Sequence, residues 1–150
     1  MDRQISTPLF RKIDSLQIPV PDLEAGLAFY RDRVGHELIW RTDTSAGLCI
    51  PASDAEIVVQ TTRPELEANL TVASTDEAVV TICQAGGRVI VQSFDIPIGR
   101  CAVVEDPWGN RLVLLDNSRG LLVTDANGQV LVDADGKPRV TRAEGPIVGP

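Results

Sequence analysis

The side chains best suited to metal binding or nucleophilic catalysis are few in this sequence. Cys49, Cys83 and Cys101 are widely spaced within apolar runs, and His36 is the only histidine. Zinc clusters and Ser-His-Asp triads need several such residues together. We therefore expect three buried, reduced thiols without a metal or redox role. His36 follows Gly35 at the end of a predicted helix, where a charged imidazole is favourable for the helix dipole without any catalytic reason.

Three further features of the sequence could belong to a metal-binding or ligand-binding site. Asp133-Ala-Asp-Gly136 has part of the spacing of a calcium loop, but the glutamate required further on is absent, which favours a plain turn. Arg100 lies between two apolar stretches, so it either lines a pocket or pairs with an acid, because a buried arginine is rarely unpaired. For Trp40 and Trp108, positions facing a ligand and positions packed in a core or turn stay equally open.

Composition and charge limit the classes of function. The chain has 150 residues, of which 43% are hydrophobic and 23% are charged, as is typical of a globular protein. The formal net charge is −7 without a basic cluster, which argues against nucleic acid or an anionic membrane surface as a partner. No run approaches the roughly 20 apolar residues of a membrane span. The opening MDRQISTPLFRKIDS lacks the features of a signal peptide, so we expect a cytoplasmic protein.

An internal repeat organises most of the chain. Each half reads as a strand, a helix and three strands, with Val20 and Val72, and Gly35 and Gly87, each 52 residues apart. A repeated element order predicts two equivalent modules. The expected strands are 13–20, 36–42, 47–51 and 55–61 in the first half, and 67–73, 88–93, 100–105 and 111–116 in the second. The expected helices are 23–34 and 76–85, the second with Ser74 as its N-cap.

The chain continues beyond the repeat. Asp106-Pro-Trp-Gly-Asn110 has the residues of a turn, and the apolar strand that follows it suits a central position with both faces covered. Residues 119–150 form an extension in which Asn127-Gly128 predicts a hairpin over 123–132, with a frayed end. Because an isolated hairpin is marginal in water, we expect it to dock on a partner subunit or on the outer face of a sheet.

The double βαβββ order, the opening IPVPDLEAGLAFYRD and the closing GRCAVVEDPWGNRLVLLD together resemble the vicinal oxygen chelate superfamily of glyoxalases, bleomycin-resistance proteins and extradiol dioxygenases. The resemblance covers about residues 12 to 116. It implies an α+β, glyoxalase-like fold in which two βαβββ modules, 12–62 and 66–116, form a curled mixed sheet. The expected domain is then 1–118, followed by a C-terminal β-hairpin tail. The resemblance also implies a homodimer.

Metal-dependent members place ligands on four strands. By resemblance, those positions are Ser15, Val58, Glu67 and Val113 in this sequence. Valine has no lone pair to offer, so only Glu67 is a good ligand, and we expect no metal cofactor.

A displaced set of Gln17, Glu56 and Glu67 stays open as a divalent-metal alternative. Gln17 and Glu56 would each lie about 6.6 Å from the usual ligand position on the same strand, at a rise of about 3.3 Å per residue. For Glu56 and Glu67, we favour exposure to solvent over a place in the pocket. For Gln17, a hydrogen bond to strand backbone at the rim is the alternative.

The favoured hypothesis is a metal-independent protein whose apolar cup binds a small organic molecule. The alternatives are a metal-dependent lyase, isomerase or dioxygenase with rearranged oxygen ligands, and a non-catalytic structural or regulatory module with a filled cup. Whether the protein is an enzyme stays open. The expected ligand-binding residues are Ser15, Gln17, Trp40, Val58, Glu67, Arg100 and Val113.

Overall fold

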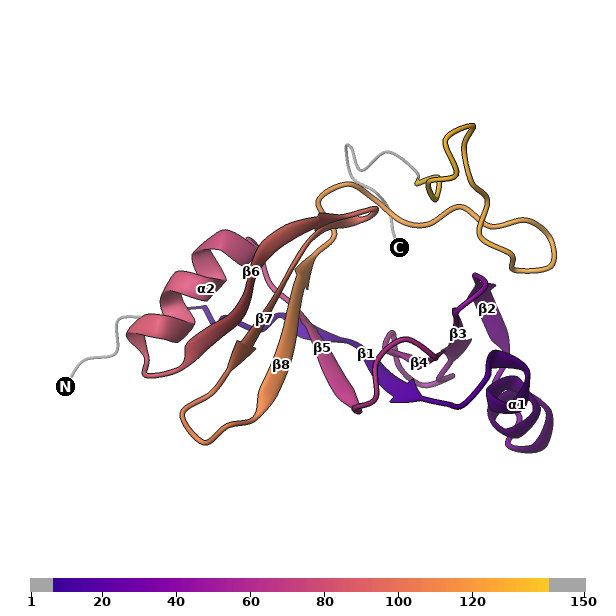
Figure 1. The fold of residues 1–150 in the computed structure, drawn as a ribbon, viewed down its shortest axis with the longest axis horizontal. Helices are drawn as coiled ribbons and strands as arrows, with labels where there is room; N and C mark the ends of the chain where they lie inside the picture. The colour runs from indigo at the N-terminus through magenta and orange to yellow at the C-terminus, as the bar shows by residue number, and fades with distance from the viewer. Residues whose placement is uncertain (1–6, 141–150) are drawn as a thin grey trace.

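The computed structural model describes residues 7–140 of the chain. Eight strands form one mixed sheet in the order β2-β3-β4-β1-β5-β8-β7-β6, with helices at its two ends (Figure 1). The first module contains β1 (Lys12–Pro19), α1 (Leu23–Leu27), η1 (Ala28–Arg33), β2 (Leu38–Arg41), β3 (Ser45–Cys49) and β4 (Glu56–Gln60). The second contains β5 (Glu67–Thr71), α2 (Thr75–Gln84), β6 (Arg88–Ile96), β7 (Gly99–Glu105) and β8 (Arg111–Asp116).

Strand pairing confirms the predicted repeat. In the first module β1 runs parallel to β4, and in the second β5 runs parallel to β8. The first strands of the two modules, β1 and β5, pair antiparallel at the centre of the sheet. Gln17 lies opposite Val58, and its counterpart Asn69 lies opposite Val113. The α+β, glyoxalase-like fold expected from the sequence is therefore confirmed.

The helices cover one face of the sheet. Asp22 caps α1 by accepting a hydrogen bond from the N–H of Ala25 at 2.8 Å, and Ser74 caps α2 by accepting from the N–H of Glu77 at 3.2 Å. Beneath α1 lies a cluster that includes Leu27, Leu48 and Val59. Beneath α2 lies a second cluster with Ala78, Ala102 and Leu114. Because side chains alternate along a strand, the neighbouring residues point to the uncovered, concave face.

The first helix differs from its prediction as an α-helix over 23–34. Residues Ala28–Arg33 form a π-helix, in which the N–H of Val34 donates to the carbonyl of Phe29 five residues earlier. The apolar spacing of Leu23, Leu27 and Tyr30 fits both kinds of turn over so short a length, so the pattern could not separate them.

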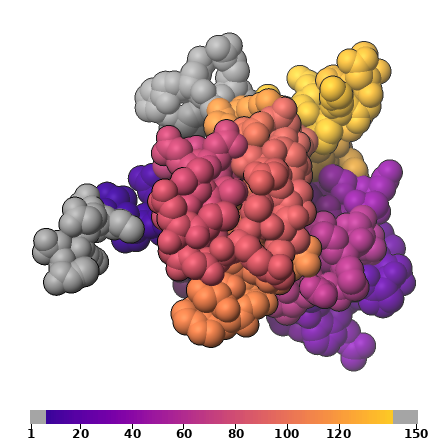
Figure 2. Space-filling view, turned by 60° about the vertical axis from the view of Figure 1, so that its left-hand side comes forward, coloured from indigo at the N-terminus to yellow at the C-terminus, as the bar shows by residue number. Residues whose placement is uncertain are grey.

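The predicted C-terminal hairpin forms, and within this chain it docks on the edge of the sheet instead of on the outer face expected from the sequence. Thr124 pairs with Val130 across its turn. The N–H of Arg41 in β2 donates to the carbonyl of Gly128 at 2.7 Å, and the N–H of Val130 donates to the carbonyl of Arg41 at 2.8 Å. The extension (orange to yellow) therefore stands beside the first module (purple) in both views (Figures 1 and 2), and it crosses above the concave side of the sheet (Figure 1). The predicted frayed end, residues 143–150, lies outside the described residues.

Three turns of the sequence pattern D-x-x-G share one geometry. In each, the first Asp accepts hydrogen bonds from the backbone N–H groups two and four residues later. The glycine in each has a positive φ that favours glycine: 89° at Gly109, 84° at Gly128 and 83° at Gly136. The predicted turns at 106–110, 127–128 and 133–136 are therefore confirmed.

The expectation of three buried thiols is correct only in part. All three cysteines are free, and Cys101 is buried in β7, but Cys83 is exposed on α2 and Cys49 is half-buried. An apolar run in a helix still presents part of its residues to solvent, which explains the position of Cys83. Within residues 7–140, no helix combines the length and the apolar character needed to cross a membrane.

Candidate functional site

A cavity of about 510 Å³ lies on the concave side of the sheet. Strands of both modules form its floor and walls, and the C-terminal extension adds a further wall. Its apolar lining includes Val58, Leu115, Leu122, Val130 and Pro138. Its polar lining is Asp14, Ser15, Gln17, Thr42, Ser45, Glu56, Asn69, Asn117 and Thr124. The hairpin, whose role the sequence left open, thus contributes directly to the cavity.

Trp40 is held at this cavity by two contacts. Its indole lies against Gly47 of β3, where any Cβ would collide with the ring. Its Nε1–H donates to Oε1 of Glu56 at 2.8 Å, across the intervening strand. Trp40 therefore lines the cavity, whereas Trp108 is 82% exposed at the turn between β7 and β8.

Two carboxyl groups, those of Asp14 and Glu56, line the cavity. A β-bulge between Ile13 and Ser15 makes Asp14 the extra residue of β1, so that it lines the cavity together with Ser15. Burial raises the pKa of Asp14 above its ordinary value, against a hydrogen bond from Ser15 and the charge of Lys12. Burial also raises the pKa of Glu56, against the bond from Trp40, and the charge of Asp14 adds to the rise.

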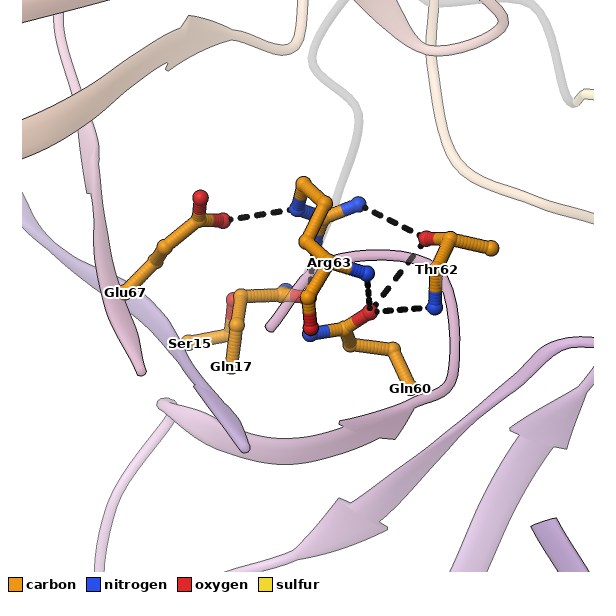
Figure 3. Close-up of polar contacts among 6 residues, drawn as sticks. All are labelled: Ser15, Gln17, Gln60, Thr62, Arg63 and Glu67. Carbon is orange, nitrogen blue, oxygen red and sulfur yellow. Dashed lines mark hydrogen bonds and ion pairs between the residues drawn. The ribbon is translucent and has the colours of Figure 1, made fainter. Parts of the chain in front are cut away.

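At the junction of the modules, Arg63 bonds to groups from both (Figure 3). Its Nε–H donates to Oε1 of Glu67 at 2.9 Å, and its Nη2 donates to Oε1 of Gln17 at 3.1 Å. Gln17 in turn donates from Nε2 to Oγ of Ser15 at 2.9 Å. The guanidinium therefore links β1 of the first module to β5 of the second. It also neutralises Glu67, whose side chain is only 7% exposed.

The loop carrying Arg63 is fixed by Gln60 (Figure 3). Gln60 is 2% exposed, and its Oε1 accepts from the backbone N–H of Thr62 and of Arg63, each at 2.8 Å. Its Nε2 donates to the carbonyl of Arg63 at 2.9 Å. One buried amide thus satisfies three backbone groups of the loop and sets the direction in which Arg63 leaves it.

Cys101 belongs to the same concave face. It packs with Val103 and Val113, beyond the cavity. Burial raises the pKa of its thiol to about 11, with smaller and opposing effects from the charges of Arg63 and Glu67. A thiol in this state is protonated at neutral pH and is a poor nucleophile.

The sequence model of the "Glyoxalase/Bleomycin resistance protein/Dioxygenase superfamily" matches residues 12–114. The chain belongs to this superfamily. No curated protein sequence matches the chain.

Several solved structures share the fold of this chain. Methylmalonyl-CoA epimerase from Mycobacterium tuberculosis is 20% identical with a TM-score of 0.63, over 75% of this chain and 92% of that one. An extradiol ring-cleaving dioxygenase from B. fuscum is 19% identical with a TM-score of 0.56, over 73% and 33% of the two chains. A Mn(II)-bound glyoxalase from Novosphingobium aromaticivorans is 18% identical with a TM-score of 0.55, over 73% and 40%. At these identities the likeness shows the fold alone.

The four ligand positions expected for this superfamily lie on one face, as strand alternation requires. Ser15, Val58, Glu67 and Val113 are all buried. Two are aliphatic, and the best oxygen donor among them, Glu67, is already paired with Arg63. Within residues 7–140, no group of three or more His, Cys, Asp or Glu side chains is placed to hold a metal ion. The residues present therefore do not fit a divalent metal.

The predicted ligand-binding residues separate into three places. Ser15, Gln17, Trp40 and Val58 line the cavity. Glu67 and Val113 share its face but lie outside the cavity lining. Arg100 is elsewhere: its guanidinium bonds to Asp95 at 2.8 Å and to Asp76 of α2 at 3.3 Å, so it pairs with acids, which was one of its two predicted roles.

The favoured exposure of Glu56 and Glu67 to solvent is wrong. Glu67 is 6% exposed and ion-paired, and Glu56 lines the cavity and bonds to Trp40. The three residues of the alternative metal set, Gln17, Glu56 and Glu67, have different partners. Arg63 bonds to Gln17 and Glu67, whereas Glu56 lines the cavity.

Sequence reasoning missed Arg63, Gln60 and Asp14. Arg63 lies in the linker between the two modules, only four residues before the predicted ligand position Glu67, and this proximity was the available signal. Asp14 was hidden because strict alternation puts it on the opposite face from Ser15, and nothing in the sequence marks the bulge.

Proposed function

We propose that this superfamily member binds a small organic molecule in its cavity without a divalent metal ion. The observation that carries the proposal is the position of Arg63, whose guanidinium bonds to Glu67 and Gln17 among the strands where metal-dependent members place their ligands. In this proposal, the guanidinium of Arg63 supplies among these strands the positive charge that a metal ion supplies in metal-dependent members.

The repulsion between Arg63 and a metal ion supports a metal-independent site. A divalent ion recruited by Glu67 would lie next to the guanidinium. Two unit charges about 4 Å apart repel by about 4 kcal/mol at an effective dielectric constant near 20, and a divalent ion doubles that. Val58 and Val113 offer no lone pair, so the attraction of Glu67 is the main term against this cost, and Glu67 is already paired with Arg63.

The cavity has the dimensions and lining of a ligand site. Its volume of about 510 Å³ falls within the usual range of roughly 300–1,000 Å³ for small-molecule pockets. Apolar side chains from both modules and the extension surround a few polar groups, such as Ser15, Gln17 and Asn69. This arrangement supplies apolar burial for affinity and placed hydrogen bonds for orientation.

Two measurements on the full chain test the proposal. The protein, purified from medium containing Mn²⁺, Fe²⁺ and Zn²⁺, should contain no stoichiometric metal by elemental analysis. Its melting temperature should be unchanged by EDTA and should rise with members of a small-molecule library. One tightly held metal ion per chain, or the absence of any ligand-induced shift, would overturn the proposal.

A homodimer stays part of the proposal by family resemblance. The cavity takes lining from both modules and the extension of one chain, so we expect ligand binding to survive dilution to the monomer. Analytical ultracentrifugation across a concentration series, with affinity measured at each concentration, checks both statements. Affinity that falls in parallel with the dimer fraction would contradict a self-contained site.

A further inference from the structure

We propose that the cavity selects organic cations, with a ligand ammonium or guanidinium group held between the carboxylates of Asp14 and Glu56 beside Trp40. This inference rests on the proposed function, because it assigns the chemical class of the molecule bound in the same cavity.

The two carboxylates come from neighbouring strands. Ser15 of β1 and Glu56 of β4 are direct partners in the parallel ladder, and Asp14 immediately precedes Ser15 at the bulge. Both Asp14 and Glu56 line the cavity. Two acids thus converge on one side of the ligand space, supplied by backbone pairing and not by a mobile loop.

Within the part of the chain that the structure describes, no basic side chain lines the cavity beside this pair. The residues lining the cavity include no Lys, Arg or His. Within the described residues, the ion pairs engage other acids, and Lys12 is the basic group whose charge acts on Asp14. Arg63, which bonds to Gln17 on this face, is committed to Glu67 and Gln17.

The pKa values of the pair are consistent with a missing counter-charge. Burial raises the pKa of both carboxyl groups, and the charge of Asp14 raises that of Glu56 further. A cation bound between them would reverse this effect, because an opposite charge stabilises the ionised forms.

The remaining polar groups suit a nitrogen donor. Asn69 lines the cavity, and its buried Oδ1 has no hydrogen-bond partner among the described residues, so a rotation of this side chain would let it accept an N–H from the ligand. The indole of Trp40 also lines the cavity, and aromatic rings attract cations over their faces. The apolar walls around these groups favour an organic cation over a hydrated metal ion.

Matched probes test the inference by calorimetry on the full chain. Each set keeps one scaffold (benzyl, naphthylmethyl or biphenylmethyl) and changes the head group from amine to alcohol to carboxylic acid. The amine should bind at least about tenfold more tightly than the alcohol, and the acid most weakly. Equal binding of amine and alcohol, or a preference for the acid or for Ca²⁺, would overturn the inference while leaving the proposed function intact.

Substitutions of the two acids test whether they cause the preference for amines. Asp14→Asn and Glu56→Gln should each reduce amine affinity several-fold, and the double variant should remove the preference while alcohol affinity stays within about twofold. The exposed Asp54→Asn changes the net charge by the same amount outside the cavity lining and should leave all affinities unchanged. A preference retained in the double variant would contradict the assignment. Failure of every amine to bind would overturn this inference, whereas the library screen described above decides the proposed function separately.

Discussion

The Nε atom of Arg63 lies 2.9 Å from Oε1 of Glu67, and the same guanidinium reaches Oε1 of Gln17 at 3.1 Å. One side chain from the linker thus joins the central strands of the two modules. In doing so it places a fixed positive charge among the positions where the superfamily's metal-dependent members bind their ion.

Arg63→Met should lower the free energy of unfolding by about 1–3 kcal/mol, because it leaves the buried Glu67 carboxylate without its charged donor. Adding Glu67→Gln should recover part of this loss, since the amide carries no charge to compensate. Urea denaturation of the single and double variants measures both effects.

The control for that pair is Arg88→Met. Arg88 also pairs with a glutamate, Glu105 at 2.7 Å, but its side chain is 71% exposed. Its loss should therefore cost well under about 1 kcal/mol. Equal losses at Arg63 and Arg88 would contradict a special role for the ion pair with the buried Glu67.

Val130→Asp should detach the C-terminal hairpin and open the cavity. Val130 is 5% exposed and lines the cavity next to its backbone bond with Arg41, so a carboxylate there would be buried without a partner. We expect a loss of ligand affinity of at least about tenfold and faster proteolysis after Ser118. Val132→Asp, at a position 56% exposed in the same hairpin, should change neither.

Gly47→Ala should displace Trp40, because the added methyl would occupy the space of the indole ring. The bond from Trp40 to Glu56 would then break. In a Trp108→Phe background Trp40 is the only tryptophan, and its emission should shift to the red as the ring becomes more exposed. An unchanged spectrum would mean that the strand relaxes without moving the ring.

Acidification should stabilise the cavity region. The folded-state pKa values of Asp14 and Glu56 are raised, so the folded state binds more protons than the unfolded chain, and this contribution to stability falls as pH rises. The window begins near the ordinary values of 3.8 and 4.5 and extends up to the raised ones. Asp14→Asn combined with Glu56→Gln should flatten the pH dependence of the unfolding free energy in that window and raise stability at pH 7.

Thiol reactivity should differ sharply among the cysteines. Cys83 is exposed, whereas Cys101 is buried with a pKa of about 11. At pH 8 a thiol reagent should modify Cys83 first and Cys101 only after unfolding. Mass spectrometry of the native protein over time measures the order. Rapid modification of Cys101 in a Cys83→Ser variant would show that the concave face opens readily.

The sequence by itself determined the module repeat, the aliphatic residues at two ligand positions and the turns around Gly109, Gly128 and Gly136. These features depend on alternation, helix caps and glycine conformation, which act over a few residues and are visible locally. The same local information misassigned Glu67 as solvent-facing and left the face of Arg100 open.

Only the tertiary structure decided which side chains line the cavity and which pair beside it. Asp14 lines the cavity because pairing with β5 introduces a bulge, and Arg63 reaches Glu67 because Gln60 fixes the linker between the modules. The hairpin closes one side because β2 offers it a free edge. Each of these outcomes depends on contacts between segments distant in the chain or on irregular backbone, for which residue periodicity carries no signal.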